Sequence, residues 1–139
     1  MKAFDTDILT QILRGNPVFS ERVAKIPVVE QSLPIVVTEE ALRGRLNTIR
    51  QAEAGKAKIT IEKAYQYFEE TLKDLRQFTI LSYISQAEER YREWRQQKVR
   101  GLTHDLRIAA ICVAHSATLV TINRGDFEHI PGLSVEFWE

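Results

Sequence analysis

The segment that most constrains the fold is Thr103–Ala114, near the end of this 139-residue chain. After Asp105 it reads Leu-Arg-Ile-Ala-Ala-Ile-Cys-Val-Ala, which places apolar side chains on nearly every side of a helix. A helix that is apolar all round lies in the interior of a protein, so this segment is expected at the centre of the domain. Cys112 lies inside the run, and because it is the only cysteine we interpret it as a small core residue that forms no internal disulfide.

Strand-like runs alternate with helical periodicity along the rest of the chain. Strands are expected at Lys2–Phe4, Ile35–Val37, Phe78–Leu81 and Thr118–Thr121, with Leu133–Phe137 as an edge strand. Strands that alternate with helices favour a parallel sheet that is covered on both faces. The sequence therefore predicts an α/β fold.

Helices are expected between these strands. Their approximate ranges are Ile8–Gly15, Asn16–Pro27, a long helix that starts at Glu39 behind a Thr38 cap, Thr60–Gln77, Ser85–Lys98 and Thr103–Ala114. A Gly-Lys-Ala-Lys stretch at Gly55–Lys58 separates the third helix from the fourth, which predicts a helical hairpin between the second and third strands. Because no repeat or linker divides the chain, residues 1–139 are expected to form one domain.

The overall charge excludes a strong general attraction for polyanions. Lys plus Arg and Asp plus Glu both total 19, so the formal net charge is zero. Any contact with a nucleic acid must therefore be local. No apolar run reaches the roughly 18 residues of a membrane span, and an acidic residue stands where a signal peptide needs an apolar stretch, so we expect a cytoplasmic protein.

Four acidic residues, Asp5, Glu40, Asp105 and Asp126, lie near junctions between expected strands and helices. The carboxyl ends of parallel strands line one crevice, so these side chains are candidates for a single site. Carboxylates that are crowded together repel one another unless a cation neutralises them, and Mg²⁺ or Mn²⁺ prefers such oxygen ligands. For each residue taken alone, the alternative is a favourable interaction with a helix dipole.

Four short motifs follow one another along the chain, and their order and spacing allow a comparison with known protein families. They are Phe4–Leu9, Val37–Gly44, His104–Ala110 and Ala117–Leu133. Together they resemble the motifs of PIN-domain nucleases, and the last segment resembles the C-terminal part of VapC-type toxins from bacterial toxin–antitoxin pairs. Two positions depart from the pattern. Asp7 stands where Asn is common, and it either adds a negative charge near the metal or caps the first helix. Arg107 replaces an apolar residue and is expected to face the substrate or an interface.

The resemblance implies a PIN-like three-layer α/β/α sandwich with a central parallel sheet and a helical hairpin insertion. It also implies an Mg²⁺- or Mn²⁺-dependent endoribonuclease in which Asp5, Glu40 and Asp105 hold the metal and a metal-activated water attacks an RNA phosphodiester. Asp126 or Asn123 takes the fourth position. As a toxin, the protein would form a homodimer and bind a cognate antitoxin.

Further residues are expected to assist the site. Thr6 and Thr121 lie next to the carboxylates and either orient a ligand or act as caps. Local positive charge for RNA comes from arginines that flank the motifs, namely Arg14, Arg43, Arg107 and Arg124. Two alternatives stay open: a PIN-domain nuclease that processes RNA without an antitoxin, and a catalytically silent α/β binding module.

Overall fold

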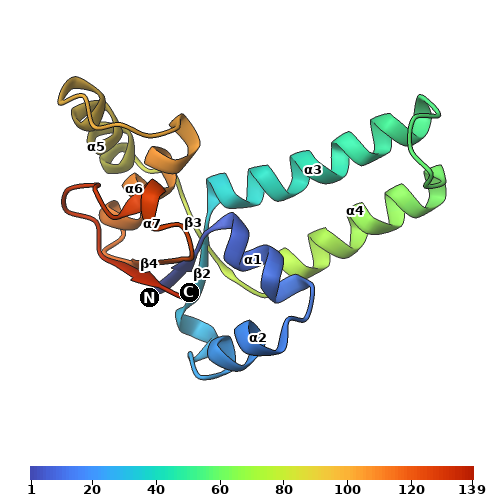
Figure 1. Cartoon of the computed structure of the whole chain (residues 1–139), viewed down its shortest axis with the longest axis horizontal. Coiled ribbons are helices and arrows are strands. Elements are labelled where there is room, and N and C mark those ends of the chain that lie inside the picture. Colours follow the sequence, from blue (N-terminus) through green and yellow to red (C-terminus); the bar gives the residue numbers. More distant parts are fainter. The chain divides into compact units, whose positions relative to one another are not determined.

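The structure is a computed structural model that describes every residue, Met1–Glu139. Five parallel strands form one sheet in the order β3-β2-β1-β4-β5 (Figure 1). The strands are β1 (Lys2–Phe4), β2 (Gln31–Pro34), β3 (Thr79–Leu81), β4 (Thr118–Thr121) and β5 (Val135–Phe137). Phe4 of β1 is paired with Val120 of β4, which brings the ends of these two strands side by side. The expected parallel sheet is confirmed, with β5 at one edge.

Seven α-helices and one short 3₁₀-helix connect and follow the strands. They are α1 (Thr6–Leu13), α2 (Pro17–Ala24), η1 (Val28–Glu30), α3 (Ile35–Glu53), α4 (Ile61–Leu75), α5 (Ser85–Gln96), α6 (Thr103–Ala114) and α7 (Arg124–Phe127). None of the helices combines the length and the apolar character that crossing a bilayer requires.

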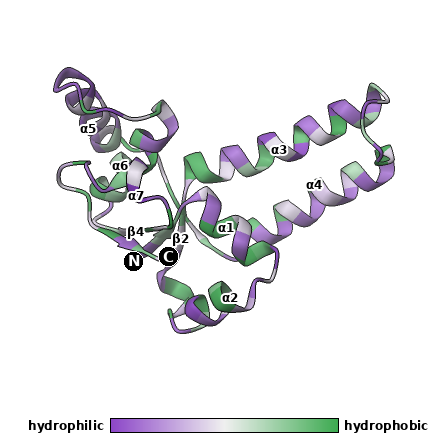
Figure 2. Cartoon of the chain, viewed as in Figure 1, coloured by the Kyte–Doolittle hydropathy of each residue, from purple (hydrophilic) through white to green (hydrophobic).

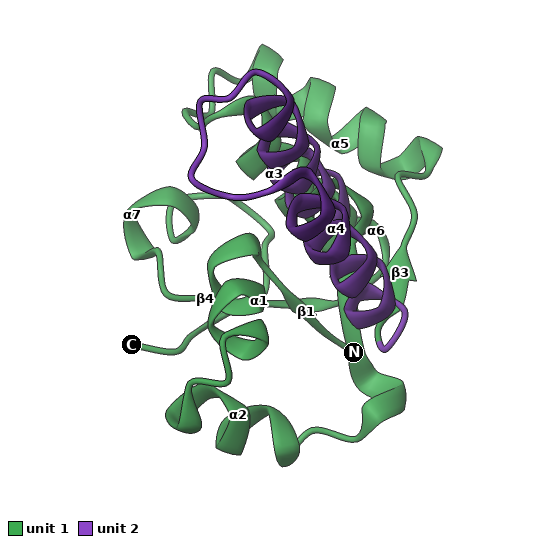
Figure 3. Cartoon of the chain, turned by 90° about the vertical axis from the view of Figure 1, so that its right-hand side faces the viewer, with its two compact units in different colours: residues 1–37, 78–139 green, residues 38–77 purple.

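The chain divides into two compact units, shown in different colours in Figure 3. Unit 1 consists of residues 1–37 and 78–139 and contains the whole sheet, with α1 and α2 on one face and α6 on the other. This is the α/β three-layer arrangement that the sequence predicts. Unit 2, residues 38–77, contains nearly all of α3 together with α4, and it is the helical hairpin expected between the second and third strands.

The core of unit 1 is built around α6, as expected from its sequence. Leu106 and all residues from Ile108 to Cys112 are buried, and α6 stands out as apolar in Figure 2. Leu119 and Val120 of β4 are also fully buried. The thiol of Cys112 is buried and unpaired, which confirms its assignment to the core. Burial raises the pKa of this thiol to about 12, so it stays protonated.

The prediction of a second strand at Ile35–Val37 is wrong. The strand is Gln31–Pro34, and Ile35 already begins α3. Three β-branched residues favour a strand locally, but such propensities are weak beside tertiary packing. In the observed register Leu33 is buried and the Ser32 hydroxyl donates to the Lys2 carbonyl at 2.8 Å.

The early start of α3 also corrects the expected cap at Thr38. This residue lies inside the helix, where its hydroxyl is buried without a hydrogen-bond partner. Glu40 is therefore the sixth residue of a helix rather than a residue that closely follows a strand. Thr60, in contrast, does cap α4, because its side chain accepts from the backbone N–H of Lys63.

We predict that Trp94→Ala lowers the free energy of unfolding by about 3–5 kcal/mol, the usual effect of removing a buried aromatic ring. Trp94 lies on α5, which packs against α6, and its side chain is only 1% exposed. Urea unfolding followed by circular dichroism measures the difference. Gln96→Ala, an exposed change on the same helix, is the control and should have an effect within about 0.5 kcal/mol. Equal effects of the two changes would contradict the packing role of Trp94.

Candidate active site

Asp5 occupies the junction between β1 and α1, and its carboxylate is only 3% exposed. It is the N-cap of α1: Oδ1 accepts from the backbone N–H of Ile8 at 2.9 Å. Its own backbone N–H donates to the carbonyl of Val120 at 3.2 Å, so the residue is tied to both central strands. The capping bond explains why the sequence folds this way locally, because Asp is among the preferred residues at a helix start.

Thr121, at the end of β4, holds the other oxygen of Asp5. Its hydroxyl donates to Asp5 Oδ2 and accepts from the backbone N–H of Asn123 at 3.0 Å. Asn123 in turn donates through Nδ2 to the carboxylate of Asp7 in the first turn of α1. These bonds connect the ends of β1 and β4 with the starts of α1 and α7. Thr121 is therefore a structural partner of Asp5, one of the two roles expected for it.

The pKa of Asp5 is raised from 3.8 to about 6. Desolvation by burial is the largest cause, and the nearby charges of Asp7 and Asp105 raise the pKa further. The hydrogen bonds from Thr121 and Ile8 act in the opposite direction because they stabilise the ionised form. The carboxylate is thus held in an environment that disfavours its negative charge.

Asp105 is the third residue of α6, in the first turn of the buried helix. Its side chain is half-buried, and its charge contributes to the raised pKa of Asp5. Asp5 and Asp105 come from opposite ends of the sequence and are brought together by the packing of α6 beside β4. Asp7, in the first turn of α1, adds a third negative charge near Asp5, which is one of the two possibilities that the sequence leaves open for it.

Glu40 lies in the second turn of α3 and belongs to unit 2. Its side chain is half-buried, whereas the neighbouring Glu39 is exposed and pairs with Arg43 one turn later. A groove along α3, within unit 2, is lined by both glutamates together with Arg43, Asn47 and others.

The structure separates the two candidates for the fourth position. Asn123 is the N-cap residue of α7 and part of the network that includes Thr121 and Asp7. Asp126 lies inside α7 and is exposed, and it contacts Asn123 only through its backbone N–H, which donates to the Asn123 carbonyl at 3.3 Å. Thr6, the other expected auxiliary residue, is the first residue of α1 and is half-buried beside Asp5.

Three of the four arginines expected to contact RNA are exposed. Arg14 follows the last residue of α1. Arg43 forms its ion pair with Glu39, and Arg124 forms one with Glu139 and lies over the ring of Phe137 at 4.3 Å. Exposed pairs of this kind are weak, so the ion pairs of Arg43 and Arg124 cost little to break.

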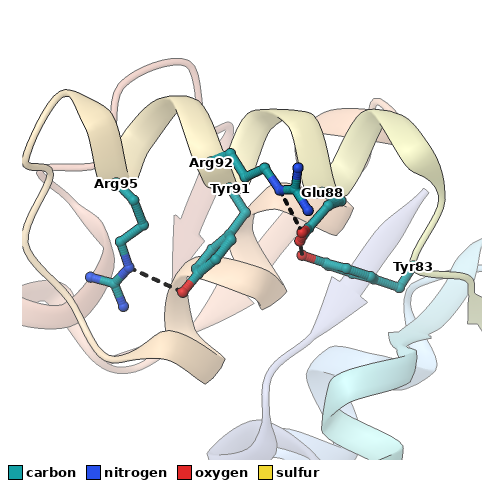
Figure 4. A network of polar contacts seen from close by, with 5 residues as sticks. All are labelled: Tyr83, Glu88, Tyr91, Arg92 and Arg95. Atoms are coloured by element: carbon teal, nitrogen blue, oxygen red, sulfur yellow. Dashed lines mark hydrogen bonds and ion pairs between the residues drawn. The ribbon is translucent and has the colours of Figure 1, made fainter.

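Arg107, the fourth arginine, packs within unit 1. Its guanidinium lies 5.0 Å from the ring centre of Tyr91 and 6.0 Å from that of Tyr83, both contributed by the α5 region. Tyr83 also donates a hydrogen bond to Glu88 at 2.6 Å (Figure 4). Burial, followed by the bond to Glu88, raises the pKa of Tyr83 to about 12. Arg107 therefore packs between α5 and α6 of its own chain, which is neither of the two roles expected for it.

The donor set suits a hard dication in its chemistry. The carboxylates of Asp7 and Asp105 lie close enough to Asp5 to raise its pKa, and a bound Mg²⁺ would compensate these charges. No three His, Cys, Asp or Glu side chains in the structure already converge into a complete metal-binding group. The side chains present thus fit a cation in type and charge, through Asp5, Asp7 and Asp105, and not as a preformed cluster.

The fold agrees with those of chains from toxin–antitoxin complexes. The chain is similar to one in VapBC2 from Rickettsia felis bound to a promoter DNA fragment (21% identity, 99% of this chain and 98% of that chain covered, TM-score 0.72). It is also similar to a chain in a toxin–antitoxin complex from Klebsiella pneumoniae, with 24% identity, 96% of this chain and 95% of that chain covered, and a TM-score of 0.70. A chain in DNA-bound VapBC from Salmonella typhimurium has 19% identity, with 99% of this chain and 98% of that chain covered and a TM-score of 0.75. No protein-family model and no curated protein matches the sequence. The resemblance to VapC-type PIN domains is thus confirmed at the level of the fold.

We predict that Asp5→Asn stabilises the metal-free protein at neutral pH. A native pKa of about 6 against an ordinary value of 3.8 corresponds to a penalty on the order of 3 kcal/mol when the carboxylate is ionised. The penalty is absent below pH 4, grows as the pH rises from 4 to 6, and is complete above 6. Asn removes it, so urea unfolding in EDTA should show the gain at pH 7.5 and little difference at pH 4. A gain that increases toward low pH would contradict burial of the charged form as its cause.

Proposed function

We propose that this protein is an Mg²⁺- or Mn²⁺-dependent endoribonuclease and the toxin of a toxin–antitoxin pair. The observation that carries the proposal is the buried carboxylate of Asp5, whose pKa is raised partly by Asp7 and Asp105, at the ends of the two central parallel strands. The shared fold with chains of toxin–antitoxin complexes supports it. A location in the cytoplasm, where RNA is available, belongs to the same proposal.

In this proposal Asp5, Asp105 and Glu40 hold the metal ion. When bound, the ion lowers the pKa of a coordinated water and stabilises negative charge on the phosphate in the transition state. The protein's own part is to fix the ligands. Thr121 and the backbone N–H of Ile8 hold both oxygens of Asp5, and above pH 6 this carboxyl group gives up its proton and becomes available as a ligand.

Asn123 is the preferred fourth group. Its Nδ2 donates to Asp7, and this bond leaves the amide oxygen as the atom that can accept from a metal-bound water or contact the metal. Asp126 is exposed on α7 and has no such orientation. Asp7, at a position where Asn is common, would thus orient the amide group of Asn123 by accepting its hydrogen bond.

RNA would be drawn to the site by local charge, since the chain as a whole is neutral. Arg43 lies on the same groove of α3 as Glu40, and Arg124 begins α7 directly after Asn123. Arg14 lies at the far end of α1 from Asp5. The antitoxin and a second copy of the chain are the proposed protein partners.

Purified protein is expected to cleave single-stranded RNA in Mg²⁺ or Mn²⁺ and to lose this activity in EDTA. Asp5→Asn and Asp105→Asn should each reduce cleavage by roughly 100-fold or more, because loss of a ligand affects metal binding at least as much as loss of its supporting hydrogen bond. Glu62→Gln, an exposed change on α4, is the control. Full activity in Asp5→Asn would eliminate the proposed site, and no cleavage by the wild-type protein would favour a silent binding module.

Asn123→Ala is expected to weaken Mn²⁺ binding by roughly tenfold, the usual effect of losing a group that supports a metal site. Asp126→Asn should change it by less than about twofold, because this carboxylate lies outside the network. Isothermal titration with Mn²⁺ compares the two variants. The opposite ranking would move the fourth position from Asn123 to Asp126.

Expression of the chain alone should arrest bacterial growth, and Asp5→Asn should abolish the arrest. Co-expression of the product of an adjacent short reading frame should restore growth if the protein is a toxin. Cleavage of RNA in vitro without growth arrest would instead indicate a processing nuclease that has no antitoxin.

A further inference from the structure

The first turn of α6, which carries Asp105, lacks the side chain that usually fixes a helix start. Its N-cap residue is Leu102, which makes no side-chain hydrogen bond to the helix. A Ser, Thr, Asp or Asn at this position would accept from one of the unpaired backbone N–H groups. The N-cap side chain therefore does not fix the start of α6.

Arg95, in the last turn of α5, forms hydrogen bonds on both sides of Leu102. Nη1 donates to the carbonyl of Gly101 at 3.1 Å, and Nη2 donates to the hydroxyl of Thr103 at 3.2 Å. Nε donates to the hydroxyl of Tyr91 at 3.1 Å, one turn earlier in α5 (Figure 4). Each nitrogen of the planar guanidinium has an acceptor, so Arg95 bridges α5 and the start of α6 in a defined geometry.

Tyr91 is itself fixed from both helices. Its ring lies 5.3 Å from the guanidinium carbon of Arg95 and 5.0 Å from that of Arg107, which projects from α6. Cation–π contacts of this kind add stabilisation to the hydrogen bond from Arg95. The three hydrogen bonds of Arg95 lie at the surface, and Tyr91 connects them to Arg107 of α6.

The other arginines of α5 are used differently. Arg92 pairs with Glu88 at 2.8 Å and Arg90 pairs with Glu93 at 3.4 Å, so both pairs join residues of the same helix. The three acceptors of Arg95, in contrast, are neutral oxygens, and two of them lie beyond α5. Arg92 is thus a matched control: it has the same side chain, lies three residues away, and its ion pair stays within α5.

The loop that Arg95 holds lies directly against the residue beside Asp105. Gly101 has φ of +149°, and a Cβ built there would come within 3.2 Å of the side chain of Leu106. From the other side, Nε2 of His129 lies 2.7 Å from the carbonyl of Arg100. A shift of this close-fitting loop is therefore transmitted to the first turn of α6.

We propose that Arg95 is a positioning residue for Asp105. By joining Tyr91 to Gly101 and Thr103, it sets the start of α6 and with it the direction of the Asp105 carboxylate toward Asp5. This inference rests on the proposed function, since the carboxylate is positioned for a metal ion and RNA.

The test compares Arg95→Gln, Arg95→Lys and Arg92→Gln by Mn²⁺ titration, steady-state RNA cleavage, and hydrogen exchange at the Leu106 and Arg107 amides. Arg95→Gln should weaken Mn²⁺ binding roughly 5- to 10-fold, lower kcat with KM for RNA unchanged, and speed exchange severalfold. Arg95→Lys should recover only part of the loss, because an ammonium cannot reproduce the three directed bonds. Arg92→Gln should match the wild type in all three measurements.

The outcomes separate this inference from the proposed function. If wild-type protein binds Mn²⁺ and Arg95→Gln binds it equally well, or if Arg95→Lys recovers binding completely, Arg95 does not position Asp105. If wild-type protein binds no Mn²⁺, the proposed function fails, and unchanged exchange in Arg95→Gln would then also overturn the role of Arg95 at α6. If Arg95→Gln does not fold, Thr103→Val replaces it, because this change removes one acceptor of Arg95. Thr103→Val must then weaken Mn²⁺ binding, lower kcat and speed amide exchange, each by less than expected for Arg95→Gln, or the inference fails.

Discussion

The burial of one carboxylate between β1 and β4 is the constraint on which the rest of the site depends. Parallel pairing of the two strands places Thr121 beside Asp5, and the helix start at Ile8 supplies a second donor. These two bonds stabilise the ionised form, yet the pKa remains raised because burial outweighs them. The fold thus maintains at neutral pH a charge that it compensates only in part, and a bound cation would remove the imbalance.

The helix that organises the core also carries the second acidic residue of the site. Residues 108–112 of α6 are buried one after another, so the axis of the helix cannot shift without disturbing the packing against the sheet. Packing alone leaves the first turn less defined, because its cap is Leu102. The hydrogen bonds of Arg95 act at this point, where the apolar core ends and the site begins.

Periodicity in the sequence is sufficient to predict most of the elements and the central place of α6, since burial of an apolar helix follows from composition. It fails at Ile35–Val37, where a β-branched run begins a helix because Gln31–Pro34 pairs with β1 and β3 instead. The motifs of the sequence single out Asp5 and Asp105, and they leave open whether Asp7 adds a negative charge near the metal or caps the first helix. The bonds from Thr121 to Asp5 and from Asn123 to Asp7 each join residues 116 positions apart, and such pairings depend on the folded sheet.

A chain without net charge can still bind an anionic substrate and a cation if its charges are distributed unevenly. Many charged side chains of this protein are neutralised locally, as in the pairs Glu39–Arg43, Glu69–Lys73, Glu88–Arg92 and Arg124–Glu128. The junction of β1 and β4 differs, because Asp5, Asp7 and Asp105 bring like charges together, one of them buried. Like charges close to one another are unfavourable for folding, so their arrangement is better explained by a ligand than by stability. A net charge of zero is therefore compatible with a local excess of negative charge. In this protein the excess lies near Asp5, at the ends of β1 and β4, because many charges elsewhere are paired.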